Sequence, residues 1–401
     1  QLCSGLPRCR DHRIPDSSEK ETGGYNANGY TRTAANHHQY FKITDMTAYK
    51  LMKGNEAMAE AAILAGCDAY FGYPITPQSE VLEYLAREMP KHNRIVMQAE
   101  SEVASINMVY GAAGAGFRTM TSSSSPGISL MQEGISYIAG AELPCLIVNV
   151  NRAGPGLGTI QPGQGDYFQS TKGGGHGDYR MIVLAPASVQ EMADFVFLGF
   201  DLADKYRNPV LMLSDGAIGQ MMEKVQFKPY ERPVVDKSSW ATTGKPKTRS
   251  RNYITSLHIL PEKMEEHNRH LEEKFKAIRE NEVRYEEINT ADADYLFVAY
   301  GLSARICQKA MDIARQKGIK IGLFRPITLF PYPYQRLNEL ASSTKMMLSV
   351  ELNSGQMVED VRLAVNGKVP VEFYGRMGGM MPNPEEIVHH LETLIQYQHV
   401  N

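Results

Sequence analysis

The sequence has few cysteines, and none of them shows the spacing by which cysteines bind metal clusters. Its 401 residues hold five, scattered without a CxxC pair: Cys3, Cys9, Cys67, Cys145 and Cys307. This distribution argues against an iron–sulfur or zinc site built from this chain alone. It also suits a reducing, cytoplasmic environment.

Long apolar runs and a strong net charge are also missing. No stretch approaches the roughly 18 apolar residues of a membrane span, and we expect no signal peptide. The net charge is −3 and the isoelectric point about 6.5, so neither nucleic acid nor an acidic membrane is an expected partner. With 43% hydrophobic and 22% charged residues, the chain has the composition of an ordinary soluble globular protein.

The common motifs for nucleotides and catalytic metals are absent as well. There is no GxxxxGK[ST] stretch and no HExxH stretch. The glycines of "GAAGAG" (111–116) fall at the end of a predicted helix, whereas a dinucleotide fingerprint needs them between a strand and a helix start. Close packing and helix capping are the favoured interpretation. His176, in the glycine-rich "GGGHGD", is a minor candidate for contact with a substrate.

What the sequence does contain, from about residue 48, is a regular alternation of apolar strands and helices. Helical patterns of ten or more residues separate the strands, which indicates a parallel sheet covered on both faces. The fold class is therefore α/β. The strand patterns of this first region are "CDAYFGY" (67–73), "RIVMQAE" (94–100), "RTMTSSS" (118–124), "PCLIVNVN" (144–151), "YRMIVLA" (179–185) and "PVLMLSD" (209–215).

The alternation divides the chain into four parts. Residues 1–45 are polar and aperiodic, and we predict a disordered or non-native extension there. Residues 46–225 form the first α/β domain. Residues 226–292 form a linker with a charged helix that begins at Pro261. Residues 293–401 form a second, smaller α/β domain with about four strands and three helices.

The turn in "FGYPITPQSE" (71–80) is stiff for a simple connector. Pro74 and Pro77 remove backbone freedom in advance, so the hydroxyl of Thr76 between them is positioned without an ordering cost. The alternative is an ordinary proline-rich turn at a strand end.

Two carboxylates lie at the next strand-to-helix junction. Glu100 and Glu102 flank Ser101, and the helix that follows is almost entirely small or apolar on its inner face. One interpretation is that both simply complement the positive end of the helix. Alternatively, one of them is held out of water to share a proton with a ligand nitrogen, because a buried carboxylate is costly without a partner.

Several long blocks together resemble a known family. These are "GYPITP", "QAESEVASINMVYGAAGAG", "TSSSSPGISLMQEGISYIAGAELP", "NRAGPGLGTIQPGQGDYFQ", "APASVQEM" and "VELNSGQ". From about residue 48 onward the chain resembles the α subunit of thiamine diphosphate-dependent 2-oxoacid:ferredoxin oxidoreductases. Within that family it looks most similar to the subunit acting on branched-chain 2-oxoacids such as 3-methyl-2-oxobutanoate. The resemblance implies a pyrimidine-binding thiamine diphosphate domain in 46–225 and a domain like the transketolase C-terminal domain in 293–401.

The resemblance also implies roles for particular residues. In such enzymes a glutamate hydrogen-bonds the aminopyrimidine ring, and its position nine residues before Gly111 assigns this role to Glu102. Thr76 and Arg152 are then expected to bind the substrate carboxylate, for which a guanidinium is well suited. We expect the cofactor pocket to be lined by Tyr73, Pro74, Ile75, Ser123, Ser124 and Ser125.

The choice of substrate depends on whether the chain offers a second cation near the substrate. The loop 154–169 contains no Lys or Arg, and Lys172 lies just beyond it. A 2-oxoglutarate enzyme needs a second cation for the distal carboxylate, so an apolar acyl chain is favoured. The alternatives are a 2-oxoglutarate or indolepyruvate ferredoxin oxidoreductase subunit, a NAD-dependent Rossmann dehydrogenase, and a non-catalytic scaffold subunit.

The chain lacks a GDG…N motif for the diphosphate and its Mg²⁺, and it lacks a cysteine cluster for electrons. The resemblance implies that both belong to partners: a diphosphate-binding β subunit and γ- or δ-type subunits. Thiamine diphosphate is then shared between subunits, while Mg²⁺ and iron–sulfur clusters lie on the partners. Coenzyme A, the 2-oxoacid and ferredoxin complete the expected reaction, an oxidative decarboxylation to acyl-CoA and CO₂.

Overall fold

The structure is a computed structural model, and it describes residues 48–400, with side-chain environments described as far as residue 397. The predicted extension, residues 1–45, lies outside the described residues. Most of the described strands belong to a seven-stranded and a five-stranded sheet, and a two-stranded ribbon adds β1 (Lys50–Lys53) and β8 (Met222–Val225).

The seven-stranded sheet has the order β12-β6-β7-β5-β4-β2-β3. Its strands are parallel except β12, which pairs antiparallel with β6. The central strands β5 and β7 are buried along their whole length, as the near-continuous apolar runs predict. The strand bounds are β2 (Ala69–Gly72), β3 (Ile95–Gln98), β4 (Thr119–Ser123), β5 (Cys145–Asn151), β6 (Ile182–Leu184), β7 (Pro209–Asp215) and β12 (Thr328–Phe330).

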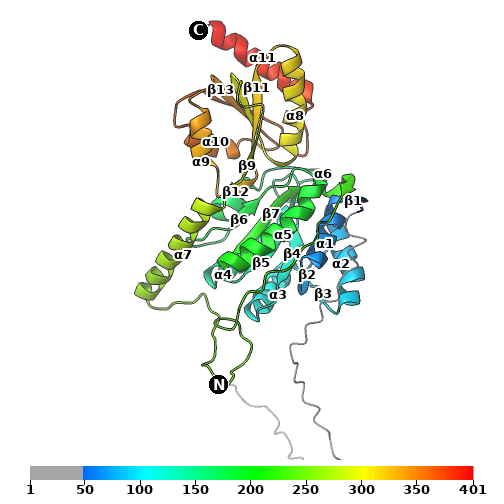
Figure 1. The fold of residues 1–401 in the computed structure, drawn as a ribbon, viewed down its shortest axis with the longest axis vertical. Helices are drawn as coiled ribbons and strands as arrows, with labels where there is room; N and C mark the ends of the chain where they lie inside the picture. Colours follow the sequence, from blue (N-terminus) through cyan, green and yellow to red (C-terminus); the bar gives the residue numbers. More distant parts are fainter. Residues whose placement is uncertain (1–47, 401) are drawn as a thin grey trace, which may run out of the picture. The chain divides into compact units, whose positions relative to one another are not determined.

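Helices cover both faces of this sheet (Figure 1). α4 (Ser125–Gly140) and α5 (Val189–Tyr206) both contact β5 and β7, yet α4 packs against α3 (Glu102–Gly114) and α5 packs against α1 (Gly54–Leu64). α4 and α5 therefore lie on opposite faces. α2 (Ser79–Glu88) and α6 (Gly216–Gln220) lie beside α1. The predicted parallel sheet with helices on both faces is confirmed.

The five-stranded sheet has the order β14-β13-β10-β11-β9, with only β9 antiparallel. α8 and α11 pack together beside it, and α9 and α10 form a second pair (Figure 1). The expectation of about four strands and three helices was therefore low by one of each. The bounds are β9 (Tyr285–Ile288), β10 (Tyr295–Val298), β11 (Ile321–Pro326), β13 (Met346–Glu351), β14 (Val371–Gly375), α8 (Gly301–Gln316), α9 (Tyr334–Leu340), α10 (Met357–Val365) and α11 (Pro384–Val400).

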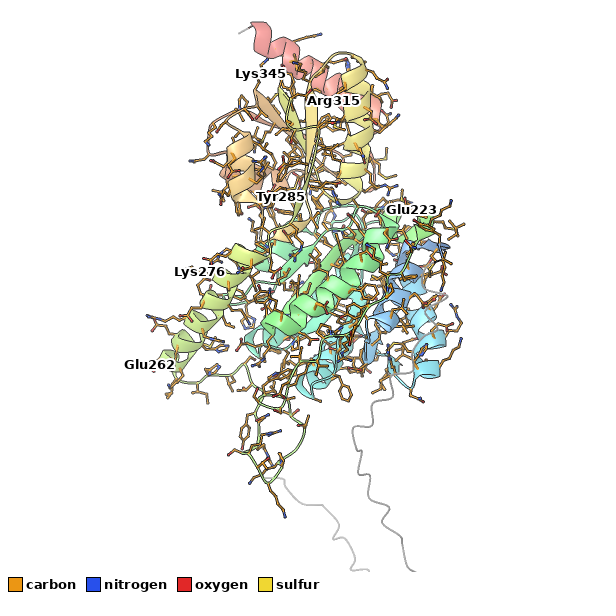
Figure 2. All side chains as sticks on the ribbon, viewed as in Figure 1. Glu223, Glu262, Lys276, Tyr285, Arg315 and Lys345 are labelled. Carbon is orange, nitrogen blue, oxygen red and sulfur yellow. The ribbon has the colours of Figure 1, made fainter. Side chains whose placement is uncertain are left out.

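The connection between the two sheets contains the charged helix that the sequence predicts. α7 (Pro261–Asn281) begins at the expected proline. Leu271, Phe275 and Ile278 on one face of α7 are buried. Glu262 and Lys276 on the same helix are exposed (Figure 2). The helix therefore packs along one face and is solvated along the other.

Two strands cross the predicted domain boundaries. β9 lies within the predicted linker but joins the five-stranded sheet, and β12 lies within the predicted second domain but joins the seven-stranded sheet. The boundaries at 225 and 292 stay a prediction. Among the described residues, no helix combines the length and the apolar character that crossing a membrane requires.

Candidate active site

The predicted site residues lie where four neighbouring parallel strands end. In the sheet order β3-β2-β4-β5, each strand leads at its carboxyl end into one of the segments singled out above. β2 leads into the turn 73–77, β3 into α3, β4 into α4, and β5 into Arg152. Ligands of open α/β sheets collect at this edge.

Glu102 is the first residue of α3, and it is buried. Ser101 caps the helix, since its hydroxyl accepts from the Ala104 amide at 3.2 Å. Only 5% of Glu102 is exposed, and its carboxylate has no hydrogen bond or ion pair among the described residues. Glu100, two residues earlier, is exposed. A buried carboxylate is costly when it is unpaired, so Glu102 is a candidate to pair with a ligand group.

The start of α4 faces this carboxylate through Gly127. A Cβ atom at Gly127 would lie 2.5 Å from Glu102 Oε1 and 2.0 Å from Ser123 Oγ. Both side chains therefore occupy the space that any other residue would need. The hydroxyls of Ser123 and Ser124 are also buried and have no hydrogen-bond partner among the described residues. The result is a group of buried polar atoms with unused hydrogen-bonding capacity.

Arg152 connects the proline-bracketed turn to the loop after β5. Its Nη1 donates to the Thr76 carbonyl at 2.9 Å, and its Nη2 donates to the Leu157 carbonyl at 3.0 Å. Thr76 is exposed, and Pro77 packs against Gly216. Each Nη atom has a second proton, so the guanidinium keeps donors for a ligand.

The remaining predicted residues divide into three groups. Tyr73 and Pro74 are exposed in the turn, and Ile75 is half-buried there. Ser125 binds the backbone of Arg152, because its hydroxyl donates to the Arg152 carbonyl at 3.0 Å. The structure does not bring His176 to this edge. His176 contacts Ser136 and Tyr137, about three helical turns along α4 from its start.

A polar network behind Arg152 was missed at the level of sequence. Asn149 Oδ1 accepts from the Ser125 amide at 3.1 Å, and Asn149 Nδ2 donates to Asp166 Oδ2 at 2.8 Å. Burial raises the pKa of Asp166, and hydrogen bonds from Ser125 and Asn149 oppose that rise. One signal was available: Asn149 is a polar residue within the apolar run "LIVNVN". Such a residue needs a buried partner.

Lys172, the nearest cation beyond the loop, is already paired. Its ammonium lies 2.5 Å from Asp360 Oδ1, and Asp360 also accepts from the hydroxyls of Tyr167 and Tyr334. Within the described part of the chain, no group of three His, Cys, Asp or Glu side chains is arranged to hold a metal ion.

The fold and the site define the class of the protein. Its seven-stranded domain has the architecture of thiamine diphosphate-binding domains. The family described as "Pyruvate flavodoxin/ferredoxin oxidoreductase, thiamine diP-bdg" matches residues 60–288, and "Pyruvate:ferredoxin oxidoreductase core domain II" matches residues 293–387. The chain belongs to the 2-oxoacid:ferredoxin oxidoreductase family, as a subunit, which confirms the resemblance found in the sequence.

Curated relatives cover nearly all of the described fold. The chain is 53% identical over 349 residues to the ketoisovalerate oxidoreductase subunit VorB of Methanothermobacter marburgensis, covering 86% of this chain and 98% of that protein. It is 36% identical over 364 residues to the 2-oxoglutarate synthase subunit KorA of Methanocaldococcus jannaschii, covering 84% and 98%.

Solved structures agree with this assignment. A 2-oxoglutarate:ferredoxin oxidoreductase from Magnetococcus marinus, with 2-oxoglutarate, coenzyme A and succinyl-CoA bound, superposes with a TM-score of 0.78 at 29% identity. The alignment covers 86% of this chain but 65% of that one. A split-gene transketolase in an inactive β4 tetramer gives a TM-score of 0.51 at 13% identity, covering 85% and 97%, and so shows the fold alone.

The residues at the strand ends fit the pyrimidine end of thiamine diphosphate. Glu102 is a buried acceptor without a partner, and a ring nitrogen bearing a proton is a suitable donor to it. The buried serine hydroxyls add further unused polar atoms.

Proposed function

We propose that this chain is the α subunit of a branched-chain 2-oxoacid:ferredoxin oxidoreductase. The complex oxidatively decarboxylates 3-methyl-2-oxobutanoate with coenzyme A, forms an acyl-CoA and CO₂, and reduces ferredoxin in the cytoplasm. The observation that carries this proposal is the buried, unpartnered carboxylate of Glu102 at the strand edge that also presents Arg152 and Thr76. The identity to a ketoisovalerate oxidoreductase subunit, 53%, exceeds the 36% identity to a 2-oxoglutarate synthase subunit.

Glu102 acts on the cofactor ring. Thiamine diphosphate, when bound, supplies the electron sink for decarboxylation. The carboxylate of Glu102 accepts a hydrogen bond from a pyrimidine nitrogen and holds the proton there. Burial strengthens this interaction, because little water competes for a carboxylate on a residue that is 5% exposed.

Arg152 and Thr76 bind the carboxylate of the 2-oxoacid. The guanidinium is held by two carbonyl groups, and its remaining N–H groups are free to donate. The hydroxyl of Thr76 stands on the same turn, next to the carbonyl that orients Arg152. A charge-assisted pair of this kind binds the carboxylate and fixes its orientation.

We infer an apolar acyl chain, because the loop 154–169 offers exposed apolar side chains and contains no Lys or Arg. Leu157, whose carbonyl accepts from Arg152, has 82% of its surface exposed, and Ile160 in the same loop is also exposed. Lys172 is neutralised by Asp360. A second substrate carboxylate, as in 2-oxoglutarate, would have no cation from this loop.

Partner subunits complete the site. Four apolar side chains on β3, α3 and α4 are exposed in the isolated chain: Ile95, Met97, Val103 and Leu130. β3, which carries the first two, is the edge strand of the sheet. We assign this surface to a β subunit that binds the diphosphate and its Mg²⁺, with iron–sulfur clusters on partner subunits and thiamine diphosphate between the chains. The isolated α subunit is then expected to bind thiamine diphosphate weakly.

The experiment is reduction of ferredoxin by the complex purified from its host. We expect 3-methyl-2-oxobutanoate to give a kcat/KM at least about tenfold above that of 2-oxoglutarate, since pocket selectivity of one to three kcal/mol is typical. The reverse preference would make the chain a 2-oxoglutarate enzyme subunit. NAD binding in a direct titration would instead support a dehydrogenase.

Glu102→Gln tests the catalytic role. Turnover should fall on the order of 100-fold or more, because the carboxylate is lost while the shape is kept. Glu100→Gln is the matched control, since Glu100 is two residues away and exposed, and it should keep near-normal turnover. A scaffold subunit would tolerate both changes equally.

A further inference from the structure

One segment of the first domain lies against the second α/β unit along most of its length. We call residues 164–172 the docking segment. Gln164 begins it and is almost fully buried. Its side-chain Nε2 donates to the Tyr300 carbonyl at 2.9 Å, and its Oε1 accepts from Ser303 Oγ at 2.8 Å and from the Leu352 amide at 3.0 Å. The start of α8 and the end of β13 therefore hold this residue.

The rest of the docking segment is held in the same way. Gln356 bonds it twice, donating to the Gly165 carbonyl at 2.7 Å and accepting from the Phe168 amide at 2.8 Å. Asp360 of α10 accepts from the Tyr167 hydroxyl at 2.6 Å and pairs with Lys172. These contacts run from one end of the segment to the other.

The side chain of Asp166, in this segment, bonds to the first domain instead of the second α/β unit. Its carboxylate accepts from Asn149 Nδ2 at 2.8 Å, and Asn149 Oδ1 in turn accepts from the Ser125 amide at 3.1 Å. The Ser125 hydroxyl bonds the backbone of Arg152 on both sides, lying 3.1 Å from its amide nitrogen and 3.0 Å from its carbonyl oxygen. A continuous polar path thus leads from the second α/β unit to the backbone of Arg152.

We propose that Asp166 is a positioning residue for Arg152, through which the docked second α/β unit orients the group that binds the substrate carboxylate. This inference rests on the proposed function, because it assumes that Arg152 binds a 2-oxoacid. Asp166 itself lies behind Arg152 and is not a catalytic residue.

The chemistry of the groups explains why a carboxylate stands at 166. Asn149 must present its oxygen to the Ser125 amide and its NH₂ group to residue 166. An ionised carboxylate only accepts hydrogen bonds, so it fixes this orientation of the amide. Without that acceptor, the Asn149 side-chain amide can turn over and release the Ser125 backbone amide, and the backbone of Arg152 loses this restraint.

The test compares Asp166→Ala and Asp166→Asn in the purified complex. Asp166→Ala should raise KM for the 2-oxoacid about tenfold and change kcat less than threefold, since substrate is bound less well while the reacting groups are unchanged. Asp166→Asn retains one acceptor oxygen. Its rise in log KM should therefore be at most half of the rise for Asp166→Ala. A KM within twofold of wild type for Asp166→Ala would overturn the proposal.

A second readout needs neither cofactor nor turnover. Hydrogen exchange at the amides of residues 152–158 in the isolated chain should become at least about tenfold faster in Asp166→Ala. Unchanged protection there would also count against the proposal. If Asp166→Ala fails to fold, Gln356→Ala replaces it, because Gln356 lies in the second α/β unit and its loss loosens the same segment. It should raise KM in the same direction, and an unchanged KM would again overturn the proposal.

Glu191→Gln is the control for a merely structural effect. Glu191 belongs to α5 and pairs with Arg325 of β11 at 2.6 Å, so it also joins the two α/β units but does not contact the docking segment. It should leave KM unchanged even where it lowers the melting temperature. An equal rise in KM for Glu191→Gln would mean that loosening the two units in general is responsible, and the specific role of Asp166 would fail. KM is measured with whichever 2-oxoacid the wild-type complex uses, so an error in the proposed substrate does not affect this test.

Discussion

At the scale of single residues, Gly127 determines whether Glu102 fits its place. A Cβ atom there would lie 2.0 Å from Ser123 Oγ and 2.5 Å from Glu102 Oε1, far inside contact distance. Gly127→Ala should therefore displace the carboxylate and destabilise the chain by about 1–3 kcal/mol, as overpacking usually does. Urea unfolding of the isolated chain measures the stability, and turnover of the complex measures the displacement.

Gly111→Ala is the control for Gly127→Ala. Gly111 lies in α3, and an added Cβ there would meet no atom within 4 Å. Because alanine is the better helix former, the isolated chain should keep its stability or gain up to about 1 kcal/mol. Equal destabilisation by both changes would mean that the close contacts around Gly127 do not matter.

The buried carboxyl group of Asp215 should make the stability of the chain depend on pH. Asp215 is buried, its carboxylate caps α6, and burial raises its pKa to about 6, although hydrogen bonds from Ile218 and Ala217 oppose the rise. The unfolded chain ionises Asp215 near its ordinary pKa, so the native state is favoured at low pH, and this contribution is lost as the pH rises through about 6. The loss is at most about 3 kcal/mol.

Asp215→Asn should remove that dependence, because an amide does not titrate. Urea unfolding at pH 4.5, 6 and 8 compares the two proteins, and the quantity of interest is the difference in their free energies of unfolding. This difference should shift in favour of the variant as the pH rises. A constant difference across the three pH values would contradict the prediction.

The sequence pattern predicted a role for Glu102 but not for Asp166, and the difference has a physical reason. Glu102 was found because a carboxylate at the start of an apolar helix stands out locally, but its burial and that of Glu100 differ only in three dimensions. Asp166 was not identified, because its partner Asn149 is 17 positions away and belongs to another element. Hydrogen bonds across elements leave no spacing pattern in a sequence.

At the scale of elements, the caps of α3 and α5 provide a matched pair. Ser101 and Ser188 each accept from the amide three residues later, at 3.2 Å and 3.1 Å. Ser101→Ala and Ser188→Ala should each cost about 1 kcal/mol of stability. Only Ser101→Ala should also reduce turnover, since it loosens the first turn that carries Glu102. Denaturant unfolding and ferredoxin reduction separate the two effects. Reduced turnover in both variants would mean that activity follows stability alone.

Element starts were predictable where a local signal marks them. The helix at Pro261 begins where the sequence predicts it. β9 and β12 were missed, because they are short, four and three residues long, and β9 reads "YEEI". Each is an edge strand of its sheet, and its partner lies elsewhere in the chain. A short edge strand depends on its neighbour more than on its own propensity.

At the scale of the whole molecule, the two α/β units are held together by specific polar contacts as well as by shared core. Arg325 of β11 binds Glu191 of α5, and Arg305 of α8 binds Glu223 of β8, which Figure 2 labels. β12 extends the first sheet from the second half of the chain. The docking segment adds the path to Arg152. Through these contacts, the second α/β unit helps to hold the candidate active site in place.

The segment that follows β8 is tied to the first domain by one buried cation. The side chain of Arg118 is fully buried and donates to Asp204 at 2.7 Å, to the Ala65 carbonyl at 2.8 Å and to the Tyr230 hydroxyl at 3.0 Å. Lys237 lies 2.8 Å from the same Asp204. Although burial alone would raise the pKa of Asp204, Lys237 and Arg118 together hold it below its usual value. This stabilisation is present at neutral pH and is lost as the pH falls below the ordinary Asp range.

Arg118→Met should therefore destabilise the chain strongly, by about 3–5 kcal/mol at pH 7, because it leaves Asp204 buried with one cation fewer. The variant should also lose less stability than the wild type when the pH is lowered from 7 to below 3.8, the ordinary pKa of Asp. Arg315→Met is the control: Arg315, labelled in Figure 2, pairs with the more exposed Asp292 at 2.7 Å. Its loss should cost at most about 1 kcal/mol. Urea midpoints of both variants measure the difference, and equal costs would show that the buried network does not anchor the segment 226–250.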